Sequence, residues 1–215
     1  MRTVKRSYGQ YCGFTRALEL VGERWALLIV RDLLIGAKRF SEIQRGLPGI
    51  PTNILAARLS ELEGSGIVRR TLLTRPEKGV TYELTDDGRA LEEAVIALGR
   101  WGAQHLGDPR PGETITQDSI ATALRTTFRP EDAKNSRLTY LLRVGPYEVH
   151  AVIRKGTIAV GRGSVPKPDL IIETGPALRL LLAGEILPAA AIKQKLVRVV
   201  GDPKLLDRFA QIFRI

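Results

Sequence analysis

The chain has 215 residues, of which 44% are hydrophobic and 26% charged. This balance is typical of one or two globular domains and excludes a wholly disordered chain. Basic residues outnumber acidic ones by 33 to 23, and 24 of the cations are arginine, which favours a polyanionic partner. No apolar run approaches the ~20 residues that span a bilayer. One cysteine, Cys12, and two histidines exclude a disulfide framework and argue against a zinc cluster. We expect a soluble, cytoplasmic protein without metal, cofactor or membrane partner.

A stretch with two prolines and two glycines, residues 106–114, divides the chain. Helical patterns dominate before it, and strand-like runs followed by helices come after it, which predicts an α+β fold of two domains, 12–108 and 117–215. The net charge is +3 up to residue 108 and +7 beyond it. Positive charge is therefore not concentrated in the first domain.

Apolar residues at three- and four-residue spacing predict four helices in the first domain, at residues 14–21, 23–35, 40–46 and 51–63. The second is apolar on most sides, which predicts burial. The fourth begins at Pro51, a residue suited to a first helical position, and places Leu55, Leu59 and Leu62 on one stripe.

Two β-rich runs, 67–72 and 80–84, flank a polar turn at 74–79 and predict a hairpin. Thr85 is a plausible N-cap for a long terminal helix. The apolar stripe expected on that helix consists of Leu91, Val95, Leu98, Trp101 and Gly102.

The order helix, turn, helix, hairpin is that of a winged helix-turn-helix domain, whose second helix enters the major groove. Small and polar residues on the exposed side of 51–63 suit base contacts, since asparagine can bridge adenine and arginine can fork onto guanine or phosphate. Cations on the hairpin turn and before the third helix suit phosphate contacts. The predicted contacts with double-stranded DNA are Lys38, Arg39, Thr52, Asn53, Ala57, Arg58, Arg75 and Lys78.

The first domain resembles the HxlR-type winged-helix transcriptional regulators over about residues 12–106. The motifs that carry the resemblance include Cys12, ALELVGERW at 17–25, RDLLIG at 31–36, PGI at 48–50 and YELT at 82–85. The resemblance implies a homodimer, paired partly through terminal helices, on a roughly two-fold symmetric DNA site. Gly13 and the pair Glu23-Arg24 depart from the usual family residues, and we expect neither change to touch the contact surface.

Some members of this family sense oxidants or electrophiles through a cysteine near the position of Cys12. Such a sensor needs a lowered pKa and solvent access. Structural packing as a small apolar residue is the simpler expectation for a lone cysteine, and both interpretations stay open.

The second domain is predicted to contain strands at 138–144, 147–154, 156–160, 169–172 and 197–200, with helices at 117–128, 176–183, 187–195 and 203–213. From about Leu138 to the end it resembles a sterol-carrier-protein-like α+β domain with a smaller sheet. That resemblance implies an apolar pocket for a lipid or acyl ligand, or a dimer surface; a packed domain without ligand is the alternative. The candidate pocket residues are Leu141, Leu181, Leu182 and Phe209.

Catalytic motifs are missing from the sequence: it has no nucleophile elbow, no Walker loop and no metalloprotease motif. We therefore expect a regulator, most simply a repressor, and not an enzyme. Two alternatives are a lipid or acyl carrier with an interaction module, and a thiol-based redox regulator acting through Cys12.

Overall fold

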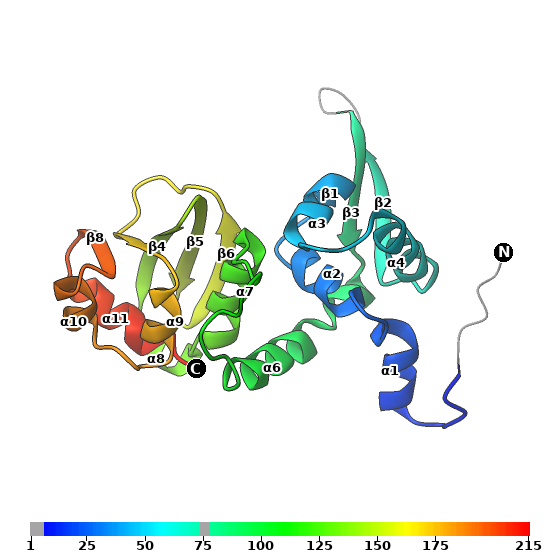
Figure 1. Ribbon diagram of the computed structural model, residues 1–215, viewed down its shortest axis with the longest axis horizontal. Helices are drawn as coiled ribbons and strands as arrows, with labels where there is room; N and C mark the ends of the chain where they lie inside the picture. The colour runs from blue at the N-terminus through cyan, green and yellow to red at the C-terminus, as the bar shows by residue number, and fades with distance from the viewer. Residues whose placement is uncertain (1–6, 74–77) are drawn as a thin grey trace. The chain divides into compact units, whose positions relative to one another are not determined.

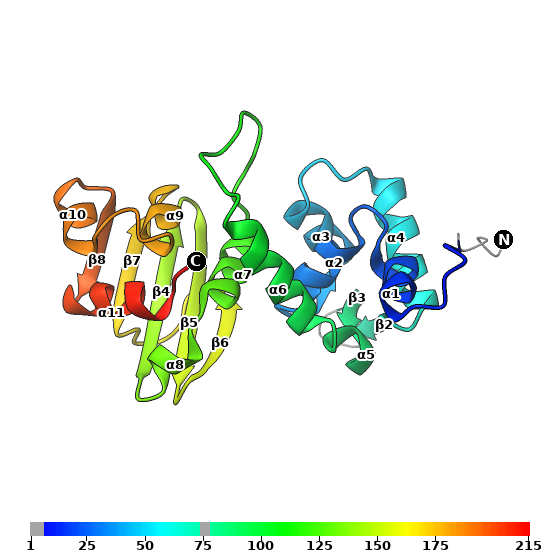
Figure 2. The same ribbon diagram turned by 90° about the horizontal axis from the view of Figure 1, so that it is seen from below.

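The computed structural model describes residues 7–73 and 78–215 (Figures 1 and 2). The chain forms two compact units, one through Val95 and one from Ile96 to Ile215. Both helices and strands occur in each unit, so the predicted α+β class is confirmed. None of the described helices is long and apolar enough to cross a membrane.

The first unit is a winged helix-turn-helix domain. Helices α3 and α4 are joined by a short turn, and strands β2 and β3 form the hairpin that follows, as the sequence predicts. The elements are α1 (Gly13–Val21), α2 (Ala26–Leu33), β1 (Lys38–Arg39), α3 (Phe40–Gly46), α4 (Thr52–Gly64), β2 (Val68–Leu73), β3 (Gly79–Leu84), α5 (Asp86–Arg89) and the start of α6 (Glu92–Ala103).

Three local features of this unit differ from the expectation. Helix α2 begins only at Ala26, because the preceding Trp25 has a left-handed backbone with φ of 79°. The extended pair before α3 becomes a short strand, β1, which pairs with β3 so that the sheet order is β1-β3-β2. The long terminal helix is interrupted: Thr85 caps α5 by accepting a hydrogen bond from the Gly88 N–H, and α6 starts afresh at Glu92.

The core of the first unit forms where α2, α3 and α4 meet. Leu55, Leu59 and Leu62 of α4 are buried, as the predicted stripe requires, and they belong to one cluster with Ile29 and Val30 of α2. Burying the leucine face of an amphipathic helix fixes which of its sides remains in solvent. The opposite face of α4 is therefore set by core packing.

The second unit contains a five-stranded sheet with the order β6-β5-β4-β7-β8. Strand β4 pairs in parallel with β7, and the other pairs are antiparallel. The strands are β4 (Arg137–Val144), β5 (Tyr147–Arg154), β6 (Thr157–Arg162), β7 (Leu170–Thr174) and β8 (Val197–Gly201). The helices are α7 (Gln117–Thr127), α8 (Pro130–Ala133), α9 (Ala177–Leu182), α10 (Pro188–Lys193) and α11 (Lys204–Ile212). All five predicted strands are confirmed, whereas α8 is too short for its pattern to be detected.

Helices gather on one face of this sheet, where aromatic rings build the core (Figures 1 and 2). Tyr140 of β4 meets Phe209 of α11 edge-on, with ring centroids 5.3 Å apart, and Phe209 stacks on Phe213 at 4.6 Å. The Tyr140 hydroxyl donates to the carbonyl of Leu205, which satisfies its polar end, and burial raises the pKa of Tyr140.

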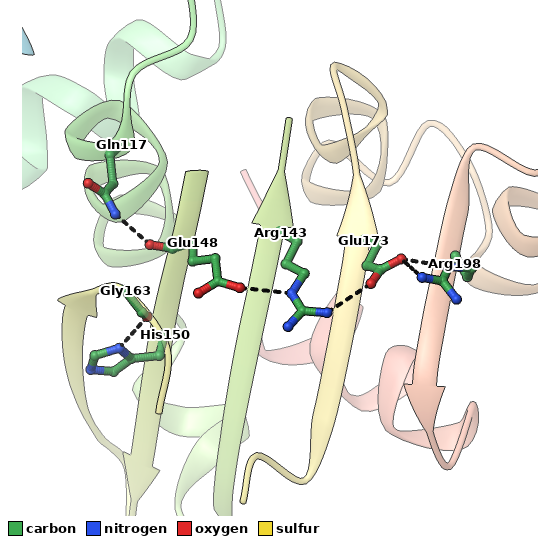
Figure 3. Close-up of polar contacts among 7 residues, drawn as sticks. All are labelled: Gln117, Arg143, Glu148, His150, Gly163, Glu173 and Arg198. Carbon is green, nitrogen blue, oxygen red and sulfur yellow. Dashed lines mark hydrogen bonds and ion pairs between the residues drawn. The ribbon is translucent and has the colours of Figure 1, made fainter. Parts of the chain in front are cut away.

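Charged side chains form a row across the opposite face of the sheet (Figure 3). Arg143 of β4 donates to Glu148 of β5 at 2.9 Å and to Glu173 of β7 at 3.1 Å, and Arg198 of β8 donates to Glu173 at 2.6 Å. Hydrogen bonds from Arg143 and then Arg198 lower the pKa of the Glu173 carboxyl. Opposite charges at paired positions help fix the register of four strands.

The C-terminal turns of α6 belong to the second unit. A side-chain carbon at Gly99 would lie 2.6 Å from Cγ2 of Thr126 on α7, so glycine permits the close approach of these helices. The Arg100 side chain donates to the carbonyl of Thr126 at 3.1 Å. Helix α6 is thus divided between the two units: its first residues belong to the first unit and the rest to the second.

Leu59→Ala should lower the free energy of unfolding of the first unit by about 2–5 kcal/mol, because it removes a buried side chain from the core. Ser60→Ala, on the exposed side of the same helix, should change it by less than about 0.5 kcal/mol. Urea unfolding followed by Trp25 fluorescence in a Trp101→Phe background measures both. Equal effects would contradict the assigned inward face of α4.

Candidate nucleic-acid interface

The exposed face of α4 carries small and polar side chains. Asn53 and Ala57 are exposed opposite the buried leucines, and Thr52 is exposed at the flank of the leucine stripe, in the first turn. Gln44 of α3 donates to the Thr52 hydroxyl at 2.8 Å, which links the two helices across their turn. A helix with short side chains on its open face can approach base edges closely, and Asn53 offers both a donor and an acceptor.

Arg58 lies at the side of this face and is held by two carboxylates. Its side chain is 17% exposed; one guanidinium nitrogen contacts Glu23 at 3.2 Å and the other is paired with Glu61. The expectation that Glu23 stays clear of the predicted contact surface was therefore wrong. Because each terminal nitrogen already contacts a carboxylate, a phosphate or a base would compete with Glu23 and Glu61 for Arg58.

The base of the wing brings together two of the predicted phosphate contacts. The Arg39 guanidinium donates to the carbonyl of Lys78 at 3.1 Å, and the Lys78 side chain is exposed. Gly79 has φ of 148°, and a side-chain carbon there would lie 2.8 Å from the Arg39 guanidinium. Glycine at this position thus makes room for Arg39. Arg75, the other cation predicted on the hairpin turn, lies outside the described residues.

Lys38 does not lie on the surface. Its position in β1, paired with Tyr82 of β3, turns the side chain into the unit, where it is fully buried. Strand alternation explains the error, since successive side chains point to opposite faces and only Arg39 is directed outward. The predicted phosphate contact of Lys38 is incompatible with this burial.

A cavity of about 320 Å³ opens beside the start of α4. Arg24 places its guanidinium 5.0 Å above the ring of Trp25, which forms part of the wall. The unusual Glu23-Arg24 pair is a partial signal for this site, whereas no sequence pattern predicts the left-handed backbone at Trp25. The lining residues are Arg24, Trp25, Gly49, Pro51, Ile54 and Arg58.

Cys12 is exposed, so the expectation that it packs in a core was wrong. It occupies the N-cap of α1. Hydrogen bonds from the backbone N–H groups of Thr15 and Phe14 lower the pKa of its thiol. The position thus has the two properties that a reactive thiol requires, access and stabilisation of the thiolate.

Large apolar side chains are exposed in both units. On α1, Phe14 is 74% exposed, and Leu18 is exposed as well. On α6, Trp101 is 64% exposed and Leu98 is also open, so the predicted stripe is buried only in part, at Val95. Apolar surface of this kind marks a surface suited to a protein partner.

The four candidate pocket residues of the second unit do not face one space. Phe209 contacts Tyr140 on the helix-covered face, and Leu181 and Leu182 are buried in α9. Leu141 follows Tyr140 in β4 and points to the opposite face, in register with His150 and Ile171. Leu141 is therefore removed from the set. In the part of the chain that the structure describes, no cluster of three or more metal-ligating side chains occurs.

Comparison with known proteins identifies the first unit. The family model of the HxlR-like helix-turn-helix matches residues 20–109. The chain is similar to the HTH-type transcriptional regulator YvaP of Bacillus subtilis, with 38% identity over 96 residues that span 45% of this chain and 88% of the relative. It is 44% identical over 96 residues to the HTH-type regulator Rv3095 of Mycobacterium tuberculosis, again 45% of this chain but 59% of that relative.

A solved structure, the redox regulator HypR in its oxidized form, shares 34% sequence identity with the chain. The match covers 46% of this chain and all of HypR, with a TM-score of 0.42.

Proposed function

The chain belongs to the HxlR-like helix-turn-helix family of transcriptional regulators, which are DNA-binding proteins and not enzymes, and from this premise we propose that it acts as a homodimeric repressor on a roughly palindromic operator. In this proposal residues 12–108 form the DNA-binding domain. The observation that carries it is the orientation of α4. Its leucines are buried, Asn53 and Ala57 are exposed on the opposite side, and Thr52 is exposed at the flank.

Two copies would each place α4 in a major groove, one helical turn apart on the duplex. The exposed apolar residues Phe14 and Leu18 of α1, and Leu98 and Trp101 of α6, support pairing of copies through these helices. Arg39 and Lys78 at the wing would contact phosphates beside the groove.

Asn53→Ala and Arg58→Ala should each weaken binding to the preferred duplex by about 1–3 kcal/mol, because each removes a predicted base contact. Lys78→Ala should weaken binding to all sequences alike and reduce the salt slope by about 1, because it removes a phosphate contact. The preferred duplex is first selected from a random pool with the full chain, and affinities are then measured over a salt series.

Lys204→Ala, an exposed change in the second unit, serves as the control, and unfolding curves establish that each variant is folded. Unchanged affinity in the Asn53 and Arg58 variants would remove these roles. Absence of any preferred duplex would favour the carrier alternative, in which the first unit is only an interaction module.

For residues 117–215 we propose a sterol-carrier-protein-like domain that takes a small apolar or acyl ligand and so modulates DNA binding. A five-stranded sheet with helices on one face and an aromatic core between them supports this proposal. The ligand would have to favour one spacing of the two α4 helices over another, since equal affinity for both shifts nothing. Leu181, Leu182 and Phe209 remain the candidate lining residues.

Native mass spectrometry of the full chain should detect a retained apolar molecule, which organic extraction removes. A matched variant, Leu181→Asp, should purify without it if the space beside α9 holds the ligand. If the wild-type protein shows only the mass of the chain without ligand under the same gentle conditions, and takes up no added fatty acid, the proposed ligand site is contradicted.

A second candidate mechanism is thiol-based regulation, which the exposure and lowered pKa of Cys12 favour. Cys12→Ser should then abolish the loss of DNA binding caused by a mild oxidant, while basal affinity stays unchanged. The measurement is duplex binding before and after oxidant, and after reduction. An equal oxidant response in wild type and variant would rule this mechanism out.

A further inference from the structure

We propose that the cavity beside α4 binds a small organic carboxylate, with its apolar body against Trp25 and Ile54 and its carboxylate between Arg24 and Arg58. The binding claim concerns the first unit alone and is independent of DNA. The cavity has a volume of about 320 Å³, which is at the lower end of the range for small-molecule sites. No role in DNA contact has been assigned above to Arg24, Trp25 or Ile54.

The charge of the lining selects an anion. Two of the six lining residues are arginines and none is acidic, and the two carboxylates that pair with Arg58, those of Glu23 and Glu61, are not part of the lining. Pro51, the N-cap of α4, provides no side-chain hydrogen bond to the first turn, and that turn contains no acidic residue. The positive end of a 13-residue helix therefore adds to the field of the two guanidinium groups.

Arg58 retains N–H donors beyond the two that contact Glu23 and Glu61. Its terminal nitrogens contact Glu23 and Glu61, but its Nε–H is buried and has no hydrogen-bond partner among the described residues. A buried donor without an acceptor is costly, and a carboxylate oxygen is the strongest acceptor that a ligand can offer it.

The rest of the wall selects an apolar body. Trp25 presents an indole ring, and Ile54 and Pro51 add aliphatic surface. Trp25 is also held in the left-handed backbone region, which is strained for a bulky residue and places its ring at the cavity. Simple inorganic anions would leave this surface in contact with water, so an organic acid fits the lining better.

Isothermal titration calorimetry of the full chain with benzoate, phenylacetate and hexanoate tests the proposal. At least one should bind saturably, and benzamide, the neutral analogue of benzoate, and acetate, which lacks the apolar body, should bind at least tenfold more weakly. In a Trp101→Phe background Trp25 is the only tryptophan, and its emission should change with the same midpoint.

Arg58→Gln should weaken carboxylate binding about 10- to 100-fold, the loss expected for one charge-assisted hydrogen bond. Arg24→Gln, at an exposed position, should weaken it as well. Arg70→Gln, an exposed arginine of β2 outside the cavity, should leave it unchanged.

Absence of saturable binding for all three acids would overturn the proposal. So would equal binding of benzamide, or carboxylate binding that survives both cavity variants. Because DNA is absent from this experiment, its failure leaves the DNA-binding proposal intact, and a failure to find an operator leaves the carboxylate site intact.

Discussion

The packing of three leucines of α4 into the core of the first unit is the interaction on which the functional interpretation depends. Leu55, Leu59 and Leu62 are nearly removed from solvent, and their burial fixes the rotation of the helix about its own axis. The exposed positions of Thr52, Asn53 and Ala57 follow from that rotation. A rotation of α4 about its axis by 100°, the angle between successive residues of a helix, would exchange polar groups for apolar ones at the surface that is proposed to contact DNA.

The sequence predicted those features that repeat along an element. The leucine stripe of α4, the hairpin and all five strands of the second unit follow from periodicity, because burial of one face imposes it over many residues. The resemblance to a family, carried by motifs spread over residues 12–106, agrees with the family model that matches residues 20–109. The leucine stripe and the family resemblance were sufficient to predict the exposed face of α4.

Features that depend on single residues or on contacts distant in sequence could not be predicted. Lys38 was expected to be exposed as a cation before a helix, but pairing of β1 with β3 buries it. The Glu23–Arg58 contact joins residues 35 positions apart. Leu141 was placed with the wrong partners, because a run of consecutive buried residues in β4 does not reveal which face each one occupies.

The account predicts that the open face of α4 lies in the major groove, and photo-cross-linking tests this most directly. A photoreactive side chain replaces Ala57, and separately Lys204 as the control, and each protein is irradiated on its selected duplex. Cross-links from position 57 to bases of the selected site, and none from position 204, are the predicted result. A folded protein that binds the duplex without cross-linking from position 57, or with equal cross-linking from both, would contradict the account.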